Sequence, residues 1–278
     1  VLLRATFLLP NMLVALAALV GAGRCELLVI SPGTATSASV EALGASCREL
    51  AALRGDGGSR VTLLLREPEL EQEHVDSIVR DLAPLFTPGR LLLHEKCAGA
   101  RAIARAHGLG LHLKSTSDWV AARHAWGAAL GASAHSADEV ALAARHGLEW
   151  VFLSPVFQPS SKPLDTRPHL GEEYLLRAQR THPALSIYAL GGIQPAAAGR
   201  LAAAGAHGVA VLGGVFRAGV GTPTAQVAEA AREFLDALAA GGQTGGGGGV
   251  GEAGDRAGRD DAACEQPRAA ASGEPPAR

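Results

Sequence analysis

Eight short apolar segments recur along the chain, and most are separated by segments in which apolar side chains have helical spacing. Each segment is continuously apolar rather than alternating, which is typical of parallel strands that are buried on both faces. The expected strands are Glu26–Ile30, Val61–Leu65, Leu91–Leu93, Gly110–Leu113, Ala128–Ala132, Trp150–Leu153, Ser186–Ala189 and Gly208–Val211. Eight strand–helix units predict an α/β fold, a (β/α)8 TIM barrel, and an open doubly wound sheet is the alternative.

The segments between the strands support this alternation. Val75, Ile78 and Leu82 form an apolar stripe at helical spacing, and Ser136 with Glu139 has the pattern of a capping box at a helix start. The helical pattern is weakest just before the fifth expected strand. No G-x-G-x-x-G motif follows the first strand, which disfavours an open dinucleotide-binding sheet.

The two ends of the chain differ in composition from its centre. Residues 1–24 are largely apolar, and we expect a disordered or loosely helical extension, with a secretory signal as the alternative. Residues 241–278 are rich in Gly, Ala, Pro and charge without hydrophobic periodicity, which predicts a disordered tail. A single barrel domain is therefore expected over residues 25–240.

Composition limits the partners and the compartment. The 278 residues carry a formal net charge of −2 with scattered Lys and Arg, so no basic footprint for nucleic acid is present. The N-terminal apolar run is short for a membrane span. The four cysteines show no metal-ligand or disulfide-framework spacing, which favours a reducing compartment. We expect a cytoplasmic protein without nucleic-acid or membrane partners, and homo-oligomer formation stays open.

Two of the expected strands, the seventh and the eighth, end in double glycines. Gly191 and Gly192 follow one strand, and Gly213 and Gly214 follow the other. In a TIM barrel the last two strands commonly build a phosphate site, where glycine lets backbone N–H groups approach the anion. We therefore predict a phosphate-binding site at these four residues, although glycines that merely end strands are the alternative.

Polar side chains at other strand ends complete the predicted active site, because TIM-barrel sites lie at the carboxyl ends of strands. Arg66, His94, His112 and Ser133 are the expected substrate-binding residues, and Arg66 has a structural ion pair as its alternative. His112 lies inside a strand, where a hydrogen-bonded core histidine is the more ordinary interpretation.

Two side chains are candidates for catalysis. His135 follows the fifth strand, and an imidazole there can transfer protons near neutral pH. Lys162 lies in a Pro-rich loop after the sixth strand, where a solvated surface charge is the alternative. A metal site built from His94, His112 and His135 is conceivable, but no carboxylate accompanies them at the fourth and fifth strand ends, so we expect no metal.

The order and spacing of six motifs make residues 26–239 resemble the thiamine phosphate synthase/TenI superfamily. The motifs are Leu64-Leu-Arg-Glu67, Gly110-Leu-His-Leu113, Gly131-Ala-Ser-Ala-His-Ser136, Val151-Phe-Leu-Ser-Pro-Val-Phe157, Ala189-Leu-Gly-Gly-Ile193 and Gly205-Ala-His-Gly-Val-Ala-Val211. The resemblance implies a β/α barrel, a role in thiamin biosynthesis, and a phosphorylated thiazole-type small molecule as the ligand.

The superfamily contains a synthase, and the chain departs from the synthase pattern at several positions. The synthase joins hydroxymethylpyrimidine, from its diphosphate, to a thiazole phosphate, and binds Mg²⁺ through Asp residues after the third and fourth strands. Those positions are matched here by His94 and Ser117, or by Asp118 if the loop shifts by one residue. A diphosphate-contacting Lys is matched by Pro68, and residues 159–162 keep only a hydroxyl and a Lys.

These departures favour the TenI branch, whose members lack the metal site. The activity that this resemblance implies is a thiazole tautomerase, a cofactor-free isomerisation of a carboxythiazole phosphate by a proton shift, with His135 as the acid/base. The first alternative is an Mg²⁺-dependent thiamine-phosphate synthase, the only case in which a cofactor is expected. The second is a non-catalytic phosphate-ligand binding protein.

Overall fold

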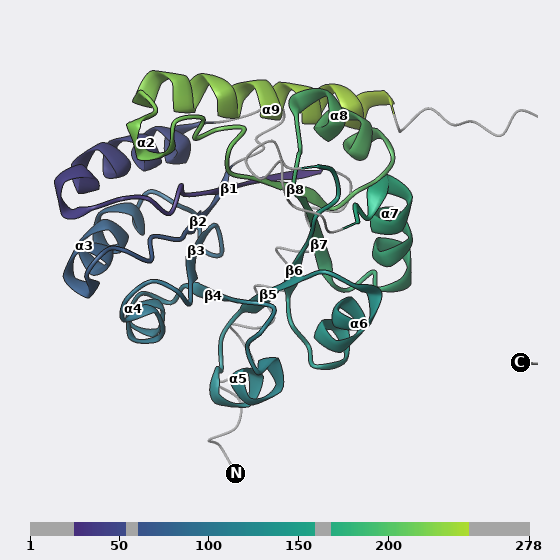
Figure 1. The fold of residues 1–278 in the computed structure, drawn as a ribbon, viewed down its shortest axis with the longest axis horizontal. Helices are drawn as coiled ribbons and strands as arrows, with labels where there is room; N and C mark the ends of the chain where they lie inside the picture. The colour runs from purple at the N-terminus through teal and green to yellow at the C-terminus, as the bar shows by residue number, and fades with distance from the viewer. Residues whose placement is uncertain (1–24, 54–60, 159–167, 245–278) are drawn as a thin grey trace, which may run out of the picture. The chain divides into compact units, whose positions relative to one another are not determined.

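A closed barrel of parallel strands forms the centre of the protein (Figure 1). The computed structural model describes residues 25–53, 61–158 and 168–244. The strands in these ranges are β1 Glu26–Ile30, β2 Thr62–Leu65, β3 Leu91–His94, β4 Gly110–Leu113, β5 Leu130–Ala134, β6 Trp150–Leu153, β7 Ser186–Leu190 and β8 Gly208–Val211. Neighbours pair in chain order, and β1 closes the ring with Leu27 beside Val209 of β8. The predicted TIM barrel is confirmed.

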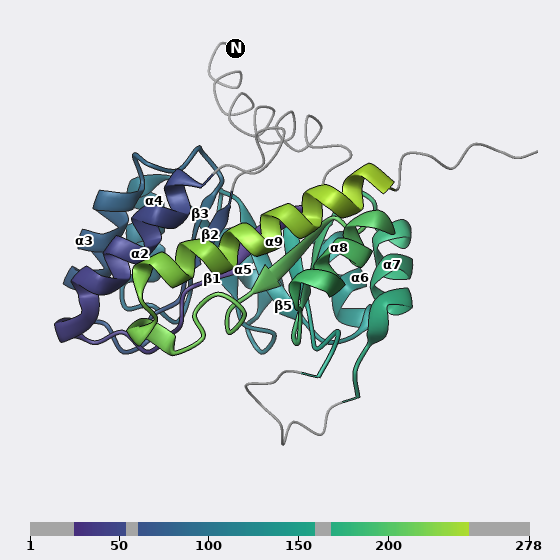
Figure 2. The same cartoon turned by 90° about the horizontal axis from the view of Figure 1, so that it is seen from above.

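Helices surround the barrel in the described part of the chain (Figure 1). They are α2 Val40–Ala52, α3 Gln72–Leu82, α4 Ala100–His107, α5 Trp119–Ala125, α6 Ala137–Arg145, α7 Gly171–Thr181, α8 Pro195–Ala203 and α9 Thr224–Thr244. The long helix α9 packs on both α8 and α2, as Figure 2 shows. None of the helices in the described ranges is long and apolar enough to cross a membrane.

The segment with the weakest helical pattern does form a helix, α5. Its start is stabilised by Asp118, whose carboxylate accepts a hydrogen bond of 2.9 Å from the backbone N–H of Ala121. A capping carboxylate satisfies one of the N–H groups that the first helical turn leaves without a partner. Two of the residues in the helix, Trp119 and Ala122, are buried against the rest of the fold.

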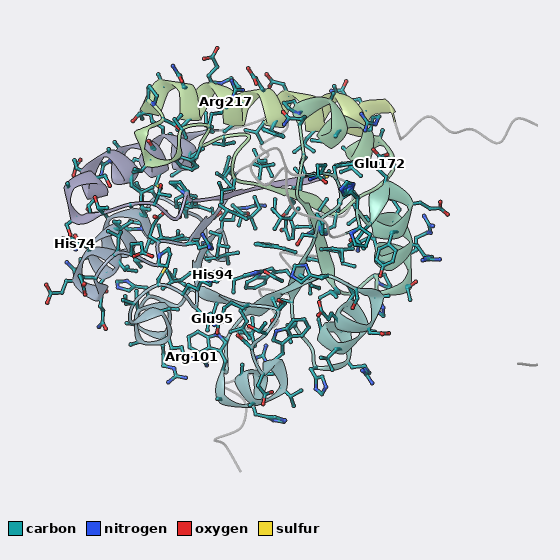
Figure 3. The ribbon with its side chains drawn as sticks, in the orientation of Figure 1. His74, His94, Glu95, Arg101, Glu172 and Arg217 are labelled. Carbon is teal, nitrogen blue, oxygen red and sulfur yellow. The ribbon has the colours of Figure 1, made fainter. Side chains whose placement is uncertain are left out.

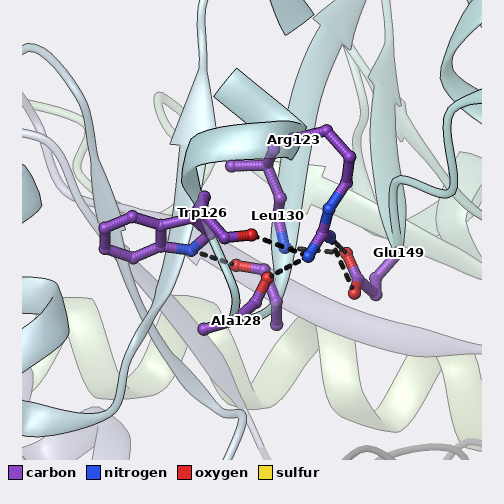
Figure 4. Close-up of polar contacts among 6 residues, drawn as sticks. Arg123, Trp126, Ala128, Leu130 and Glu149 are labelled. Carbon is purple, nitrogen blue, oxygen red and sulfur yellow. Dashed lines mark hydrogen bonds and ion pairs between the residues drawn. The ribbon is translucent and has the colours of Figure 1, made fainter. Parts of the chain in front are cut away.

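Strand β5 begins and ends two residues later than the expected segment Ala128–Ala132. The carbonyl oxygens of Ala128 and Ala129 accept hydrogen bonds from the side chains of Arg123 and Trp126, and both residues precede the strand (Figure 4). As a result, Ser133 is a residue of β5 rather than of the loop that follows it. His94 is likewise the last residue of β3.

The start of β5 is held to β6 by a partly buried polar contact at the amino end of the barrel. The carboxylate of Glu149 accepts a 2.7 Å hydrogen bond from the N–H of Leu130 and lies 3.2 Å from the guanidinium of Arg123 (Figure 4). Burial raises the pKa of Glu149, and the Leu130 N–H and Arg123 oppose that rise. This network links α5, β5 and β6, and thereby sets where β5 begins.

Large side chains of β6 and β7 fill the barrel interior opposite glycines on other strands. A Cβ atom at Gly131 would overlap the indole of Trp150, and one at Gly110 would lie 2.7 Å from it. A Cβ atom at Gly208 would lie 2.6 Å from the ring of Tyr188. Because protein interiors are close-packed, only glycine at these positions leaves room for the rings.

A larger apolar core lies between the barrel and the helices. It includes Val29 and Leu63 from strands, and Val75 and Leu201 from helices, each of which is fully buried. Successive residues of a strand point to opposite faces, so Leu64 joins the interior cluster while its neighbours Leu63 and Leu65 join this outer one. The continuous apolarity of the strands reflects these two cores.

Helix α9 extends beyond the boundary expected at residue 240. Residues 241–244, expected to start a disordered tail, are the last residues of this helix, and Gly241 is buried. A Cβ atom at Gly241 would overlap the carbonyl oxygen of Gly199 in α8. The two glycines thus let the helices approach closely, a tertiary contact that composition does not reveal. Residues 1–24 and 245–278 lie outside the described residues.

This contact predicts opposite effects for two neighbouring substitutions. Gly241→Ala places a methyl group against the α8 backbone and should lower the free energy of unfolding by about 1–3 kcal/mol. Gly242→Ala meets no atom within 4 Å and should raise it by up to about 1 kcal/mol, because Ala favours the helix. Urea denaturation of both variants measures these changes. Equal effects at the two positions would contradict the close α8–α9 contact.

Candidate functional site

Polar side chains gather at the carboxyl end of the barrel, where all eight parallel strands finish; we call this end the mouth. His94 ends β3, Glu95 follows it, and Arg66 follows β2. Figure 3 shows His94 and Glu95 in the inner part of the ring, whereas Glu172 and Arg217 lie towards its outside. In TIM barrels the mouth is the usual place of ligand binding and catalysis.

His94 is neutral and buried among positive charges. Its side chain is 5% exposed, and its Nδ1 atom accepts a 3.0 Å hydrogen bond from the N–H of Lys96. Burial lowers the pKa of His94 to about 3, and the nearby charges of Arg66, Lys96 and Lys114 contribute to the lowering. The imidazole is therefore uncharged near neutral pH, and Nε2 carries its proton.

The three cations whose charges act on this histidine are Arg66, Lys96 and Lys114, of which the two lysines are exposed, and they have no carboxylate partners among the described residues. None of the ion pairs within the described ranges involves any of them. The structural ion pair considered for Arg66 is absent there, because the Glu67 carboxylate instead accepts from the N–H groups of Gly33 and Ala35, at 2.9 and 2.8 Å. Cations that are not neutralised by carboxylates attract anions.

Glu95 is a site residue that the sequence analysis did not select. Its Oε1 atom accepts hydrogen bonds from the N–H of Lys114 at 2.6 Å and from the hydroxyl of Ser117 at 2.5 Å. Its Oε2 atom has no hydrogen bond to any described residue. Its position in the sequence, directly after His94 at the end of a strand, is the feature that could have indicated a carboxylate at the mouth.

Asp118, the alternative match for a metal-binding carboxylate, is occupied as the α5 cap. In the described part of the chain, no group of three or more His, Cys, Asp and Glu side chains is arranged to hold a metal ion. Glu95 and Ser117 are therefore the oxygen-bearing side chains that the structure brings together at the ends of β3 and β4.

His112 lies inside the barrel rather than at the surface of the mouth, and its predicted contact with substrate stays a prediction. Its side chain is fully buried, and it contacts Trp150 at Nδ1 and Ser133 at Nε2, at 2.9 and 3.0 Å. Its ring also stacks on Phe152 at 4.0 Å between ring centres. The ordinary interpretation, a hydrogen-bonded core histidine, is the observed one.

His135 is held by contacts to both its backbone and its ring. The carboxylate of Glu139 accepts from the His135 N–H at 2.5 Å, while the Glu139 N–H donates to the Ser136 hydroxyl that caps α6. The ring Nδ1 lies 2.7 Å from the carbonyl oxygen of Ser154. A carbonyl oxygen only accepts, so Nδ1 carries the proton and Nε2 of the neutral ring keeps a lone pair. His135 is half-buried.

The two double-glycine turns are neighbours, since a Cβ atom at Gly214 would lie 3.6 Å from the carbonyl oxygen of Ile193. The N–H groups of Gly192, Gly213 and Gly214 donate no hydrogen bond within the described ranges. Such backbone donors suit an anion. The glycines differ in the space available for a side chain. A Cβ atom at Gly192 would lie 2.5 Å from the Gln158 carbonyl oxygen, whereas one at Gly213 meets no atom within 4 Å.

Gly191 and Gly192 both have positive φ, at 98° and 66°, a region that side-chain-bearing residues rarely adopt. The glycines after β7 are therefore required by the backbone, independently of any ligand. The glycine at 214 is required by packing, because a Cβ there would lie 2.9 Å from the Phe234 ring. Lys162, the second expected catalytic residue, lies outside the described residues.

Comparisons with known proteins agree with this architecture. Residues 36–215 match the family model described as thiamine monophosphate synthase (TMP-TENI). A thiamine-phosphate synthase of Lysinibacillus sphaericus is 40% identical over 83 residues, which are 30% of this chain and 38% of the relative. One of Methylococcus capsulatus is 38% identical over 129 residues, 45% of this chain and 54% of the relative. The aligned segments thus span about half of these relatives or less.

Solved structures share the fold. A thiamine phosphate pyrophosphorylase from Pyrococcus furiosus superposes with a TM-score of 0.58 at 19% identity, over 79% of this chain and 98% of that one. One from Bacteroides thetaiotaomicron has a TM-score of 0.52 at 22% identity, over 77% and 97%. A Mycobacterium tuberculosis tryptophan synthase has a TM-score of 0.58 at 12% identity, over 81% and 96%. At such identities the likeness concerns the barrel alone.

The buried neutral histidines predict acid sensitivity. The pKa values of His94, His112 and His207 are lower in the folded state than in the unfolded chain, chiefly because of burial. Each therefore binds a proton better when unfolded, so stability is full above pH ~6.5 and falls as pH decreases below it. For His94, whose pKa in the fold is about 3, the slope approaches about 1.4 kcal/mol per pH unit below pH ~6.

Urea denaturation between pH 7 and 5 measures this slope. His94→Gln, which keeps a hydrogen-bond acceptor for the Lys96 N–H, should reduce the slope by about 1.4 kcal/mol per pH unit. A variant that retains the slope of the unchanged protein would show that His94 is not neutral in the fold.

Proposed function

The chain belongs to the thiamine monophosphate synthase family, and we propose that it is a transferase that joins a hydroxymethylpyrimidine group, delivered as its diphosphate, to a thiazole phosphate. The single observation that carries the proposal is the group of cations Arg66, Lys96 and Lys114, without carboxylate partners in the described ranges, beside Glu95. The names of the curated relatives support the same reaction, which was the alternative in the sequence analysis.

The mouth offers places for both anionic substrates. The three cations suit a diphosphate, which carries more charge than one phosphate and needs several positive groups. The N–H groups of the double-glycine turns suit the single phosphate of the thiazole. Holding both substrates in one barrel brings their reacting atoms together, which can contribute several kcal/mol towards lowering the barrier.

The reaction is a substitution at the methylene carbon of the pyrimidine. The bond from that carbon to the diphosphate oxygen breaks, the thiazole nitrogen supplies an electron pair for the new carbon–nitrogen bond, and diphosphate leaves with the electrons of the broken bond. Negative charge therefore develops on the departing oxygen. In this proposal Arg66, Lys96 and Lys114, whose charges act on His94, stabilise that charge by electrostatic attraction.

A diphosphate leaving group in this family implies Mg²⁺. The described side chains at the mouth offer one carboxylate, Glu95, and one neighbouring hydroxyl, Ser117, as ligands for that ion. Mg²⁺ is often bound by one or two carboxylates, with phosphate oxygens of the substrate and water completing its shell. Glu95, whose Oε2 atom has no partner among the described residues and whose Oε1 atom meets the Ser117 hydroxyl, would hold the ion. When bound, Mg²⁺ would neutralise charge on the leaving diphosphate.

A second candidate function, the TenI-type tautomerase, is favoured by the geometry of His135. Its Nδ1–H is held by the Ser154 carbonyl, so a lone pair at Nε2 is available to accept a proton from a carbon and return it elsewhere. This reaction needs one phosphate anchor and no metal. The third candidate, a binding protein without catalysis, would use the same anion sites.

Two variants distinguish the transferase from the tautomerase. Glu95→Gln keeps hydrogen-bond acceptors for Lys114 and Ser117 but removes the charge that attracts Mg²⁺, so it should lower Mg²⁺-dependent diphosphate release by about 10²-fold or more. His135→Asn should leave that rate nearly unchanged under the transferase proposal. Diphosphate release from the two substrates and isomerisation of the carboxythiazole phosphate are measured in parallel, with and without chelator.

The outcome separates the three candidates. Chelator-resistant isomerisation that falls by about 10²–10⁴-fold in His135→Asn would favour the tautomerase and reject the transferase. Ligand binding without turnover in either assay would support the third candidate, a binding protein without catalysis. Diphosphate release that ignores both the chelator and Glu95→Gln would contradict the assigned role of the carboxylate.

The thiazole-phosphate site predicts a matched pair of glycine variants. Gly213→Val puts a side chain into open space beside the N–H groups of the turns, so it should weaken thiazole phosphate binding at least about tenfold with little change in stability. Gly127→Val is the control, because it is also exposed and open but lies before β5, at the other end of the barrel. Calorimetric titration measures the affinity of both variants for thiazole phosphate. Equal affinities would show that the phosphate does not bind at these turns.

A further inference from the structure

Three side chains from neighbouring strands form a hydrogen-bonded chain inside the barrel. The indole Nε1–H of Trp150 in β6 donates to Nδ1 of His112 in β4 at 2.9 Å. The other ring nitrogen, Nε2 of His112, lies 3.0 Å from the hydroxyl oxygen of Ser133 in β5. The proposed transferase mechanism uses none of these three groups.

The chemistry of the indole decides the direction of all these hydrogen bonds. An indole nitrogen only donates, so Nδ1 of His112 must accept and has no proton. A neutral imidazole then carries its proton on Nε2, and a charged one, with protons on both nitrogens, does not fit against the indole. Nε2–H therefore donates to the Ser133 oxygen, and the hydroxyl proton of Ser133 is left to be donated elsewhere.

Packing holds the first two members in place. The indole of Trp150 lies against Gly110 and Gly131, where a Cβ atom would approach it to 2.7 Å at the first glycine and overlap it at the second. The ring of Phe152 stacks on His112 with 4.0 Å between ring centres. Neither ring can turn without displacing a neighbour in this close-packed interior.

Ser133 is the member of the hydrogen-bonded chain that reaches the mouth. It shares the inner face of β5 with Gly131, two residues nearer the carboxyl end, and it is half-buried whereas the other residues of the strand are buried. Its hydroxyl makes no hydrogen bond to a described residue other than His112. It is also two residues before His135, which directly follows the end of β5.

We propose that Trp150 is a positioning residue: acting through the fixed tautomer of His112, it makes the Ser133 hydroxyl a hydrogen-bond donor to the bound substrate. The substrate atom is an acceptor, such as a phosphate oxygen or a ring nitrogen. The identity of that substrate rests on the proposed transferase function, but the direction of the hydrogen bonds does not.

The first test measures the tautomer in the protein without substrate. Nitrogen-15 NMR of labelled protein distinguishes a protonated ring nitrogen from one with a lone pair. We expect His112 to carry its proton on Nε2, and Trp150→Phe, which keeps an aromatic ring but removes the donor, to lose this preference. Trp126→Phe is the matched control, because that buried indole donates to the Ala129 carbonyl at 3.1 Å and not to a histidine.

The second test is a double-mutant cycle on the KM for hydroxymethylpyrimidine diphosphate, or on its dissociation constant measured by calorimetry. Trp150→Phe should raise this constant about tenfold, the effect of one hydrogen bond, whereas Trp126→Phe should not. In a Ser133→Ala background the further effect of Trp150→Phe should disappear, because the indole acts through that hydroxyl. A merely structural role of Trp150 would make the two effects multiply.

The possible results separate this inference from the proposed function. A His112 that carries its proton on Nδ1, or independent effects of Trp150→Phe and Ser133→Ala, would overturn the inference and leave the transferase intact. Lack of diphosphate release and of binding by the unchanged protein would reject the transferase. The tautomer measurement would then decide by itself whether the hydrogen bonds run from the indole to the hydroxyl, and the cycle would be repeated with the carboxythiazole phosphate.

Discussion

The rest of the structure depends on filling the inside of an eight-stranded barrel at constant density. Two large rings, Trp150 and Tyr188, occupy space that Gly110, Gly131 and Gly208 leave free on other strands. A side chain at any of these glycines would overlap a ring, and a smaller ring would leave a cavity that costs stability. The pairing of large aromatic rings with glycines therefore determines how the interior of the barrel is packed.

The same packing also orients the polar groups that lie towards the mouth of the barrel. An indole that fits against two glycines places its single donor on His112, and His112 in turn meets Ser133, so an apolar packing requirement extends into a series of hydrogen bonds. A buried polar group costs stability unless it has a hydrogen-bond partner. Here the indole donates to His112, and His112 donates to Ser133. The Ser133 end of the series faces the part of the barrel where ligands of this fold bind.

Charge at the mouth is unbalanced because of geometry rather than composition. The chain as a whole is nearly neutral, with a formal net charge of −2, yet Arg66, Lys96 and Lys114 meet around His94 without carboxylate partners in the described ranges. Backbone N–H groups occupy both oxygens of the nearby Glu67 carboxylate, whereas only Oε1 of Glu95 accepts hydrogen bonds, from the Lys114 N–H and the Ser117 hydroxyl. Local positive potential of this kind attracts anions even on a neutral protein.

The sequence by itself determined the barrel, because eight continuously apolar segments alternating with helical stripes have few other ways to bury both faces of a sheet. It also located the double-glycine turns and the capped helix after His135. Only the tertiary structure decided that Glu95 meets Ser117 at the mouth, that His112 lies inside the barrel, and that α9 continues through residues 241–244. Each of these depends on contacts between segments far apart in sequence, which local periodicity and composition do not encode.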